Sequence, residues 1–273
     1  MSSERKRSAR VIAVTSGKGG VGKTNVSVNL SVAMARMGRR TLLVDGDLGL
    51  ANANILLGLN AQRTIGDVLG RGLALDEVVQ RGPGGLMLLP GHSGHDVVTG
   101  LDRHDRSRLA DTLRPMADAL DYVVLDTASG ISPQNMALAS ASDMVLLVLS
   151  AEPTAFMDAY ALVKVLAVEH GCASISVVTN QAEGEAGGRE LFRHFREVVK
   201  RFLPVTLFHL GSIPRDPSVR EAVFRRSACV EAFPDAPASA AFNRLARTIS
   251  DAELPAGPGG DSFFGMEALH GAH

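Results

Sequence analysis

The residues best suited to chemistry lie in a glycine-rich stretch near the N-terminus, Gly17-Lys18-Gly19-Gly20-Val21-Gly22-Lys23-Thr24. This stretch completes the pattern G-x-x-x-x-G-K-[ST], which is typical of a phosphate-binding loop. Glycines let consecutive backbone N–H groups turn toward phosphate oxygens with no side chain in the way. In such a loop Lys23 reaches the β- and γ-phosphates, and the Thr24 hydroxyl is placed for Mg²⁺. The stretch predicts nucleotide binding by Gly17, Gly19, Gly20, Val21, Gly22, Lys23, Thr24 and Asn25.

The residues on either side of the loop have the pattern that this chemistry needs. The β-branched run Val11–Thr15 predicts a buried strand, and apolar residues at helical spacing follow Thr24 until Gly38 ends the helix. A helix N-terminus at the loop adds positive potential where the phosphates would sit. A glycine-rich turn without a nucleotide is the alternative, but the order strand, loop, helix favours phosphate binding.

Three carboxylates follow predicted strands and are the candidates for Mg²⁺ and water chemistry. The strand Thr41–Val44 ends in Asp45-Gly46-Asp47, and the strand Tyr122–Leu125 ends in Asp126. In a parallel sheet the carboxyl ends of strands meet beside the phosphate loop. A hydrophobic run that ends in Asp is the Walker B pattern, and Gly130 follows it closely enough to offer its N–H to the γ-phosphate. An ordinary acidic turn is the alternative for Asp45 and Asp47.

The rest of the chain alternates between apolar runs and helical patterns. Further strands are predicted over 86–89, 144–149, 175–179 and 205–210, and further helices over 105–120, 153–170, 188–201, 217–226 and 237–250. Short helices and glycine turns are predicted over 51–85, with Thr64 as a helix N-cap. The alternation predicts an α/β fold, a mostly parallel twisted sheet flanked by helices on both faces. We expect a single P-loop ATPase domain over residues 11–250.

Both ends of the chain differ from this pattern. Residues 1–10 are polar and basic and predict a flexible arm, with partner binding as the alternative. Residues 251–260 are rich in proline and glycine and predict a linker. Within the tail 261–273, Phe263, Met266 and Leu269 fall on one helical face, which indicates a short amphipathic helix for weak membrane contact. An inert tail or an intramolecular clasp is the alternative.

Composition excludes several classes of protein. The 28 Lys and Arg balance 29 Asp and Glu, so no overall positive field attracts nucleic acid, and no specific nucleic-acid binding is expected. The two cysteines, Cys172 and Cys229, are far apart, which fits the cytoplasm and argues against a disulfide framework. No apolar run is long enough for a membrane span, and no secretory signal is evident. The loop 90–96 holds His92, His95 and Asp96 but shows no further ligands at metal spacing.

The extra lysine in the loop, Lys18, narrows the kind of phosphate-binding protein that the sequence indicates. The form Lys18-Gly19-Gly20-Val21-Gly22-Lys23-Thr24 resembles the deviant Walker A motif of the MinD/ParA family. The stretch 45–52, followed by Leu56-Leu57-Gly58-Leu59, resembles switch I of the flagellar number regulators called FlhG or FleN. The segments 152–154 with 158–162, and 213–216 with Val219-Arg220, are similar to the same subfamily. The resemblance covers about residues 10–250.

The resemblance implies an ATP-hydrolysing switch that is a homodimer with ATP and a monomer with ADP. Lys18 would cross the interface to the partner's phosphates, as an arginine finger does, while Lys23 and Thr24 act within their own subunit. Asp47 would position the attacking water. The Mg²⁺ shell would be held by Thr24, Asp45 and Asp126. The remaining nucleotide contacts would come from Asn52 near the interface and, at the adenine, from Asn180, Pro214, Arg215 and Asp216.

The resemblance also implies partners and a location. A member of this subfamily slowly hydrolyses ATP and regulates flagellar number and biosynthesis. It restrains a flagellar transcriptional activator of the FleQ type, or acts on the flagellar GTPase FlhF or on switch proteins of the C-ring. It would be cytoplasmic and peripheral at the inner face of the cell membrane. Residues 1–10 lack the Asp-Gln-Ala segment with which many members stimulate the GTPase.

Other functions of the same fold remain as alternatives. A ParA- or MinD-like ATPase could position another cargo, such as DNA or the division site, and the former needs a basic DNA-binding surface. An iron–sulfur carrier needs cysteines that bridge two subunits, and neither cysteine lies near a switch. A scaffold that binds ATP without turnover would not need Asp47. The segment Asn180-Gln181-Ala182-Glu183 lacks the lysine of the guanine-reading Asn-Lys-x-Asp pattern, which favours ATP over GTP.

Overall fold

A computed structural model describes residues 9–47, 51–91, 103–251 and residue 263. Several expectations therefore lie outside the described residues. These are most of the basic arm 1–10, the His92 and His95 loop, nearly all of the linker 251–260, and the tail 261–273 apart from Phe263.

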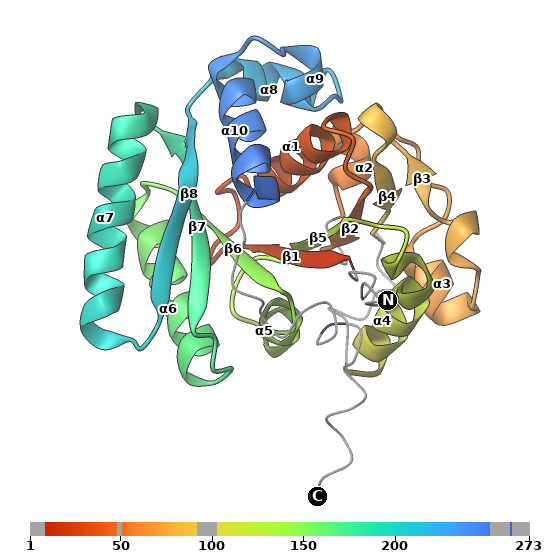
Figure 1. Ribbon diagram of the computed structural model, residues 1–273, viewed down its shortest axis with the longest axis horizontal. Helices are drawn as coiled ribbons and strands as arrows, with labels where there is room; N and C mark the ends of the chain where they lie inside the picture. The colour runs from red at the N-terminus through yellow and green to blue at the C-terminus, as the bar shows by residue number, and fades with distance from the viewer. Residues whose placement is uncertain (1–8, 48–50, 92–102, 252–262, 264–273) are drawn as a thin grey trace, which may run out of the picture.

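The centre of the molecule is a mostly parallel sheet (Figure 1). In the described residues it has eight strands in the order β3-β4-β2-β5-β1-β6-β7-β8. Only the short pair of β3 with β4 is antiparallel, and it lies at one edge. The strands are β1 (Arg10–Thr15), β2 (Thr41–Gly46), β3 (Gln80–Arg81), β4 (Met87–Leu89), β5 (Tyr122–Thr127), β6 (Met144–Leu149), β7 (Ser174–Ala182) and β8 (Thr206–Pro214).

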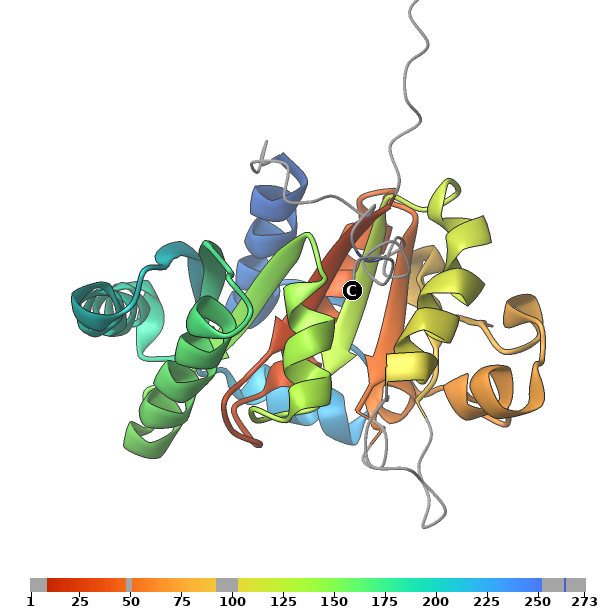
Figure 2. The same ribbon diagram turned by 90° about the horizontal axis from the view of Figure 1, so that it is seen from below.

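Helices cover both faces of this sheet, so the predicted fold class is confirmed (Figures 1 and 2). Helices α1 and α10 lie on one face, and α4, α5 and α6 lie on the other. The helices are α1 (Lys23–Arg36), α2 (Ala53–Leu56), α3 (Ile65–Arg71), α4 (Arg103–Ala117), α5 (Pro133–Ser140), α6 (Pro153–Val168), α7 (Gly184–Phe202), α8 (Pro217–Phe224), α9 (Cys229–Ala232) and α10 (Pro237–Asp251).

The core follows from the alternation of side chains along each strand. In β1, Ile12 and Val14 pack with α1 and α10 on one face, while Val11 and Ala13 face the opposite layer. All four are completely buried. Strands with apolar residues on both faces are typical of parallel sheets covered by helices on both sides, and they hold their carboxyl ends rigidly in register.

Two elements begin or extend where the sequence patterns do not indicate it. Helix α7 begins at Gly184, before the predicted start at 188, although Gly187 and Gly188 disfavour a helix. Gly188 serves packing, because a Cβ there would lie 2.2 Å from Ser212 Oγ of β8. The missing side chain allows the helix to pack closely on β8. Helix α5 is absent from the sequence prediction, although Ser132 caps its N-terminus by accepting from the Asn135 N–H at 3.3 Å.

The end of the sheet at β7 and β8 also differs from expectation. Both strands run past the predicted ends, to Ala182 and Pro214, and the Arg215 N–H donates to the Ala182 carbonyl at 2.9 Å. The pairing continues across register shifts on either side of Thr179. Pro214 therefore belongs to a strand end and not to a free loop.

Phe263 is the described residue of the C-terminal tail, and it is completely buried. It packs in the apolar cluster formed by β1, β2, β5, α3 and α4. This placement agrees with the clasp alternative, because a buried ring is not exposed to a membrane. Met266 and Leu269, the other apolar residues of the predicted helical face, lie outside the described residues.

Candidate nucleotide site

The glycine-rich loop joins β1 to α1, as predicted. Gly22 caps the helix in the left-handed conformation, with φ at 89°. A Cβ there would also lie 2.3 Å from Asn180 Nδ2, which donates to the Val21 carbonyl at 2.8 Å. At the start of the loop, a Cβ on Gly17 would lie 2.2 Å from the Asp158 backbone. Gly17 and Gly22 are thus required by close approach, and Asn180 lies against the loop.

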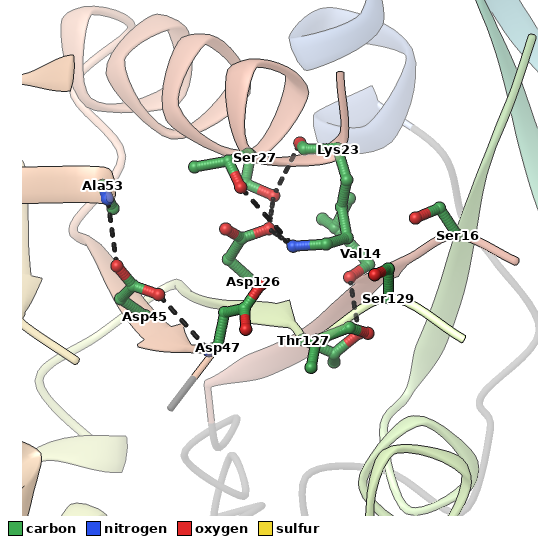
Figure 3. A network of polar contacts seen from close by, with 12 residues as sticks. Val14, Ser16, Lys23, Ser27, Asp45, Asp47, Ala53, Asp126, Thr127 and Ser129 are labelled. Carbon is green, nitrogen blue, oxygen red and sulfur yellow. Dashed lines mark hydrogen bonds and ion pairs between the residues drawn. The ribbon is translucent and has the colours of Figure 1, made fainter. Parts of the chain in front are cut away.

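A buried ion pair occupies the centre of the site (Figure 3). Lys23 Nζ donates to Asp126 Oδ1 at 2.8 Å, and the Ser27 hydroxyl donates to the same oxygen at 2.7 Å. Lys23 and Thr24 begin α1, whereas Asp126 is near the end of β5. The Lys23 ammonium is therefore held where phosphate oxygens can compete with a carboxylate for it. Sequence analysis did not identify Ser27, which lies one helical turn after Lys23 on the same face.

Asp45 and Asp126 are direct neighbours, because β2 and β5 pair in parallel with Asp45 opposite Asp126. The Asp45 carboxylate accepts the N–H groups of Asn52 and Ala53, both at 2.9 Å, and that of Asp47 at 3.3 Å. Burial raises the pKa of Asp45 to about 7, and the nearby Asp126 charge acts in the same direction. Burial also raises the pKa of Asp47. These carboxylates are consequently costly to keep charged without a cation.

The residues present fit a Mg²⁺ ion bound together with phosphates. Asp126 Oδ2 is buried and accepts no hydrogen bond, so one carboxylate oxygen has no partner among the described residues. Across the residues placed by the structure, no group of three or more His, Cys, Asp or Glu side chains gathers at metal distance. Mg²⁺ is ordinarily held by one or two carboxylates plus phosphates and water, which matches this donor set with Thr24.

Lys18 lies apart from this buried pair, at the surface. Its Nζ donates to Thr154 Oγ1 at 2.9 Å and to Glu152 Oε2 at 3.4 Å. The side chains of Lys18 and Glu152 are 41% and 63% exposed, so the contact is solvated and weak. Sequence analysis noted the segment 152–154 but did not indicate that it binds Lys18.

The remaining predicted nucleotide residues come from the loop, from α1 and from the segments that follow β2 and β5. Gly19 and Gly20 are exposed, and a Cβ on Gly19 would lie 3.5 Å from Ser129 Oγ. The Gly130 N–H donates to the Ser16 carbonyl at 2.9 Å, so contact with a γ-phosphate requires this bond to be replaced. Asn52 is the N-cap of α2. Asn25 lies in the first turn of α1, where its carbonyl accepts from Asn29 Nδ2.

The predicted adenine segment lies where β8 passes into α8. Pro214 ends the strand and Arg215 is exposed. Asp216 caps α8 by accepting the Ser218 N–H at 2.8 Å, and it also accepts the Ala238 N–H of α10 at 2.9 Å. These hydrogen bonds lower the pKa of Asp216 against the opposing effect of burial. Asp216 is thus occupied in holding two helices, which leaves the backbone of this segment as the better candidate for a base contact.

Three features together define a P-loop ATPase of the MinD/ParA type. They are the glycine loop between β1 and α1, Lys23 bound to Asp126 at the end of a strand, and the second loop lysine, Lys18, at the surface. Comparison with known proteins agrees. A family model described as an AAA domain matches residues 9–170. The antiactivator FleN of Pseudomonas aeruginosa is 45% identical over 260 residues, covering 95% of this chain and 93% of that protein. The chain therefore belongs to the FlhG/FleN family of flagellar number regulators.

Further relatives fit the same assignment. The flagellum site-determining protein YlxH of Helicobacter pylori is 30% identical over 82% of this chain and 76% of its own length. The cell-division ATPase MinD of Pyrococcus furiosus superposes with a TM-score of 0.73 at 27% identity, covering 89% of this chain and 99% of that one. The MinD of Pyrococcus horikoshii, solved with Mg-ADP, superposes with a TM-score of 0.72 at 27% identity, covering 90% and 100%. The protein is an ATPase that uses ATP and Mg²⁺.

Among the described helices, none combines the length and the apolar character needed to cross a bilayer.

Proposed function

We propose that the protein is an ATP-dependent dimerising switch that regulates flagellar number. The observation that carries this proposal is the contrast between its two loop lysines. Lys23 is buried on Asp126, whereas Lys18 is exposed and held only by solvated contacts with Glu152 and Thr154. A lysine held this weakly is free to reach a second subunit at little cost. ATP would join two subunits face to face, and ADP would leave monomers.

Within each subunit the other predicted residues bind the phosphates, position the attacking water or hold Mg²⁺. Lys23 moves from Asp126 to the phosphates, and the loop N–H groups bind the same oxygens. Asp47 orients the attacking water from the end of β2. Burial raises the pKa of its half-buried carboxyl, which makes the carboxylate a stronger base toward that water. Thr24, Asp45 and Asp126 would hold Mg²⁺, which neutralises charge on the transferred phosphoryl group. Lys18 of the second subunit reaches the phosphates only when the dimer forms. Hydrolysis is therefore slow without dimerisation, because this cation is missing.

The flagellar role rests on the relatives. FleN is named an antiactivator, and YlxH is named a flagellum site-determining protein. We infer that the ATP-bound dimer restrains a flagellar transcriptional activator of the FleQ type. The GTPase FlhF and the switch proteins of the C-ring are the other partners that this family membership suggests. The proposed location is the cytoplasm, at the inner face of the membrane. Because Phe263 of the tail 261–273 is buried, weak membrane contact by this tail would have to come from the residues that follow Phe263.

Sedimentation velocity of the full chain tests the switch. With Mg²⁺ and a non-hydrolysable ATP analogue we expect dimers, and with ADP monomers. Lys18→Ala should remain monomeric in both states, while Lys164→Ala, which removes another exposed lysine, should dimerise like the wild type. Dimers of Lys18→Ala would contradict the crossing role of this lysine.

Two further measurements test the location and the flagellar role. In flotation with anionic liposomes and the ATP analogue, the full chain should float with the liposomes, whereas a chain lacking residues 265–273, which keeps the buried Phe263, should not. Equal flotation of the two chains would exclude the tail as the membrane contact. Cells lacking the protein should carry more flagella, and the wild-type gene but not Lys18→Ala should restore the count. An unchanged count would contradict the flagellar role.

A further inference from the structure

A groove lies beside α8, next to the segment Pro214–Asp216 that is predicted to contact adenine. It has a volume of about 380 Å³ and is lined by Pro217, Ser218, Arg220, Glu221, Phe224 and Phe233. Helices α8 and α9 lie at the end of the molecule beyond α10, at the top of Figure 1. We propose that this groove binds an acidic segment of a partner protein that inserts a large apolar side chain.

The apolar part of the argument is the exposure of Phe224. This ring is 70% exposed, more than any other large apolar side chain in the described part of the chain. It stands at the C-terminal end of α8, opposite the partly buried Phe233. Aromatic rings beside a hollow are the usual anchors of protein interfaces, because covering them removes much apolar surface from water.

The charged part of the argument is that an arginine accompanies each ring. The Arg220 guanidinium lies 5.5 Å from the centre of the Phe224 ring, and that of Arg225 lies 4.7 Å from the Phe233 ring. A guanidinium stacked on a ring keeps its N–H edge free to bind a carboxylate in two places. Arg225 already donates to Glu221 at 3.0 Å, whereas Arg220 forms no ion pair with any residue that the structure describes.

Formal charge is balanced over residues 215–235, with four arginines and four carboxylates, but most of these carboxylates have contacts of their own, whereas Arg220 has no ion-pair partner among the described residues. Asp216 binds two backbone N–H groups, Glu221 binds Arg225, and Glu231 accepts the Ser227 hydroxyl at 3.3 Å. Three exposed arginines, namely Arg215, Arg220 and Arg226, have no ion-pair partner within the described ranges. Only Asp235 opposes them without a contact of its own among these residues. A carboxylate beside the inserted apolar residue of a partner can therefore pair with Arg220 without displacing an existing ion pair.

The groove is also fixed in shape before any partner arrives. Asp216 ties the first turn of α8 to the start of α10. The α8–α9 turn packs against the Gly58 turn, where a Cβ would lie 2.8 Å from the Arg226 carbonyl oxygen. A binding surface that needs little ordering loses less affinity on association.

A peptide titration of the full-length chain tests the proposal. The probe is the fluorescein-labelled peptide Glu-Asp-Glu-Leu-Phe-Glu-Asp-Glu, followed by fluorescence anisotropy at low salt. We expect saturable binding that Arg220→Glu and Phe224→Ala each weaken by about tenfold or more. Replacing Leu-Phe in the peptide by Ser-Ser should weaken binding by a similar factor. Both variants change exposed side chains, and unchanged thermal unfolding would show that they fold.

The chain contains a matched control pair. Arg201 lies 5.4 Å from the ring of the 63% exposed Phe202 at the end of α7, far from the groove. Arg201→Glu and Phe202→Ala should leave peptide binding within about twofold of the wild type.

Three results would overturn the proposal. One is no saturable binding to the wild type, and another is equal weakening by the α7 variants. The third is binding of phosphatidylserine vesicles, but not of the peptide, that depends on Arg220, because this result would assign the groove to a lipid surface.

Discussion

Lys23 Nζ lies 2.8 Å from Asp126 Oδ1, and the two side chains are only 6% and 0% exposed. The same carboxylate oxygen accepts the Ser27 hydroxyl, whereas Asp126 Oδ2 accepts nothing among the described residues. The lysine predicted to bind the phosphates is thus held by the carboxylate predicted to hold Mg²⁺. Binding of ATP with Mg²⁺ would separate this pair, because Lys23 would then bind the phosphates and Asp126 would bind the metal shell.

This relationship predicts strong coupling between the two residues in stability. Lys23→Met and Asp126→Asn should each lower the free energy of unfolding by about 3–5 kcal/mol, since each leaves an unpaired charge or a broken network in the interior. The double variant should lose much less than the sum. Urea unfolding without nucleotide measures all three, and Ser27→Ala, which keeps the ion pair, should cost only about 1 kcal/mol. Additive losses would contradict the coupling.

The pH dependence of stability follows from Asp45. Its pKa is raised from 3.8 to about 7 in the folded protein, so the folded state keeps a proton that the unfolded chain releases between these values. The free energy of unfolding without Mg²⁺ should therefore fall as pH rises through this window, by an amount on the order of a few kcal/mol. Urea unfolding at pH 5 and pH 7.5 should show the loss. Asp45→Asn should flatten it, and a slope unchanged by this substitution would assign it to other groups.

Turnover should depend on Asp47 more than dimerisation does. Asp47→Ala should lower phosphate release by roughly 100-fold or more, because the attacking water loses the group that orients it. Dimers with ATP should persist, since Lys18 and the loop are unchanged. Asp76→Ala, which removes an exposed carboxylate outside the predicted site, should hydrolyse ATP at the wild-type rate. Loss of dimers in Asp47→Ala would show that this residue acts in assembly.

The contacts of Lys18 allow a sharper test of its role. If Lys18 acts across the interface, removal of Glu152 and Thr154 side chains frees it, and the double variant Glu152→Ala, Thr154→Ala should dimerise with ATP at least as tightly as the wild type. Sedimentation equilibrium with the ATP analogue measures the constant. A double variant as monomeric as Lys18→Ala would mean that Lys18 works through these residues within one subunit.

Phe263 should contribute to stability like a core residue although it lies in the tail. Phe263→Ala should lower the free energy of unfolding by about 3–5 kcal/mol, as expected for a large ring removed from a packed cluster. Phe224→Ala removes an exposed ring and should cost less than about 0.5 kcal/mol. Equal small losses in both variants would show that the tail is not docked in solution.

The parts of the site that sequence analysis predicted are those set by local chain geometry. A glycine loop between a strand and a helix, and Asp45 and Asp126 at strand ends, follow from residues close together in sequence. The partners of Lys18 could not be predicted in this way, because Glu152 and Thr154 are 134 and 136 positions away. The start of α7 was misplaced for a similar reason, since Gly188 serves a close contact with Ser212 of β8 and not helix propensity.

Asp216 closes a loop in the chain that has a consequence for how the protein can vary. The segment from Ser218 to Ala238 leaves and returns to the same carboxylate, so its ends are fixed to each other as well as to the sheet. The middle of the segment is also bound to α1, because the Val230 N–H donates to Asn29 Oδ1 and the Arg36 guanidinium donates to the Val230 carbonyl. An exchange of its sequence for that of a relative would therefore have to keep these backbone contacts as well as Asp216. Divergence of partner choice within an otherwise constant ATPase could then be confined to the exposed side chains of this one segment.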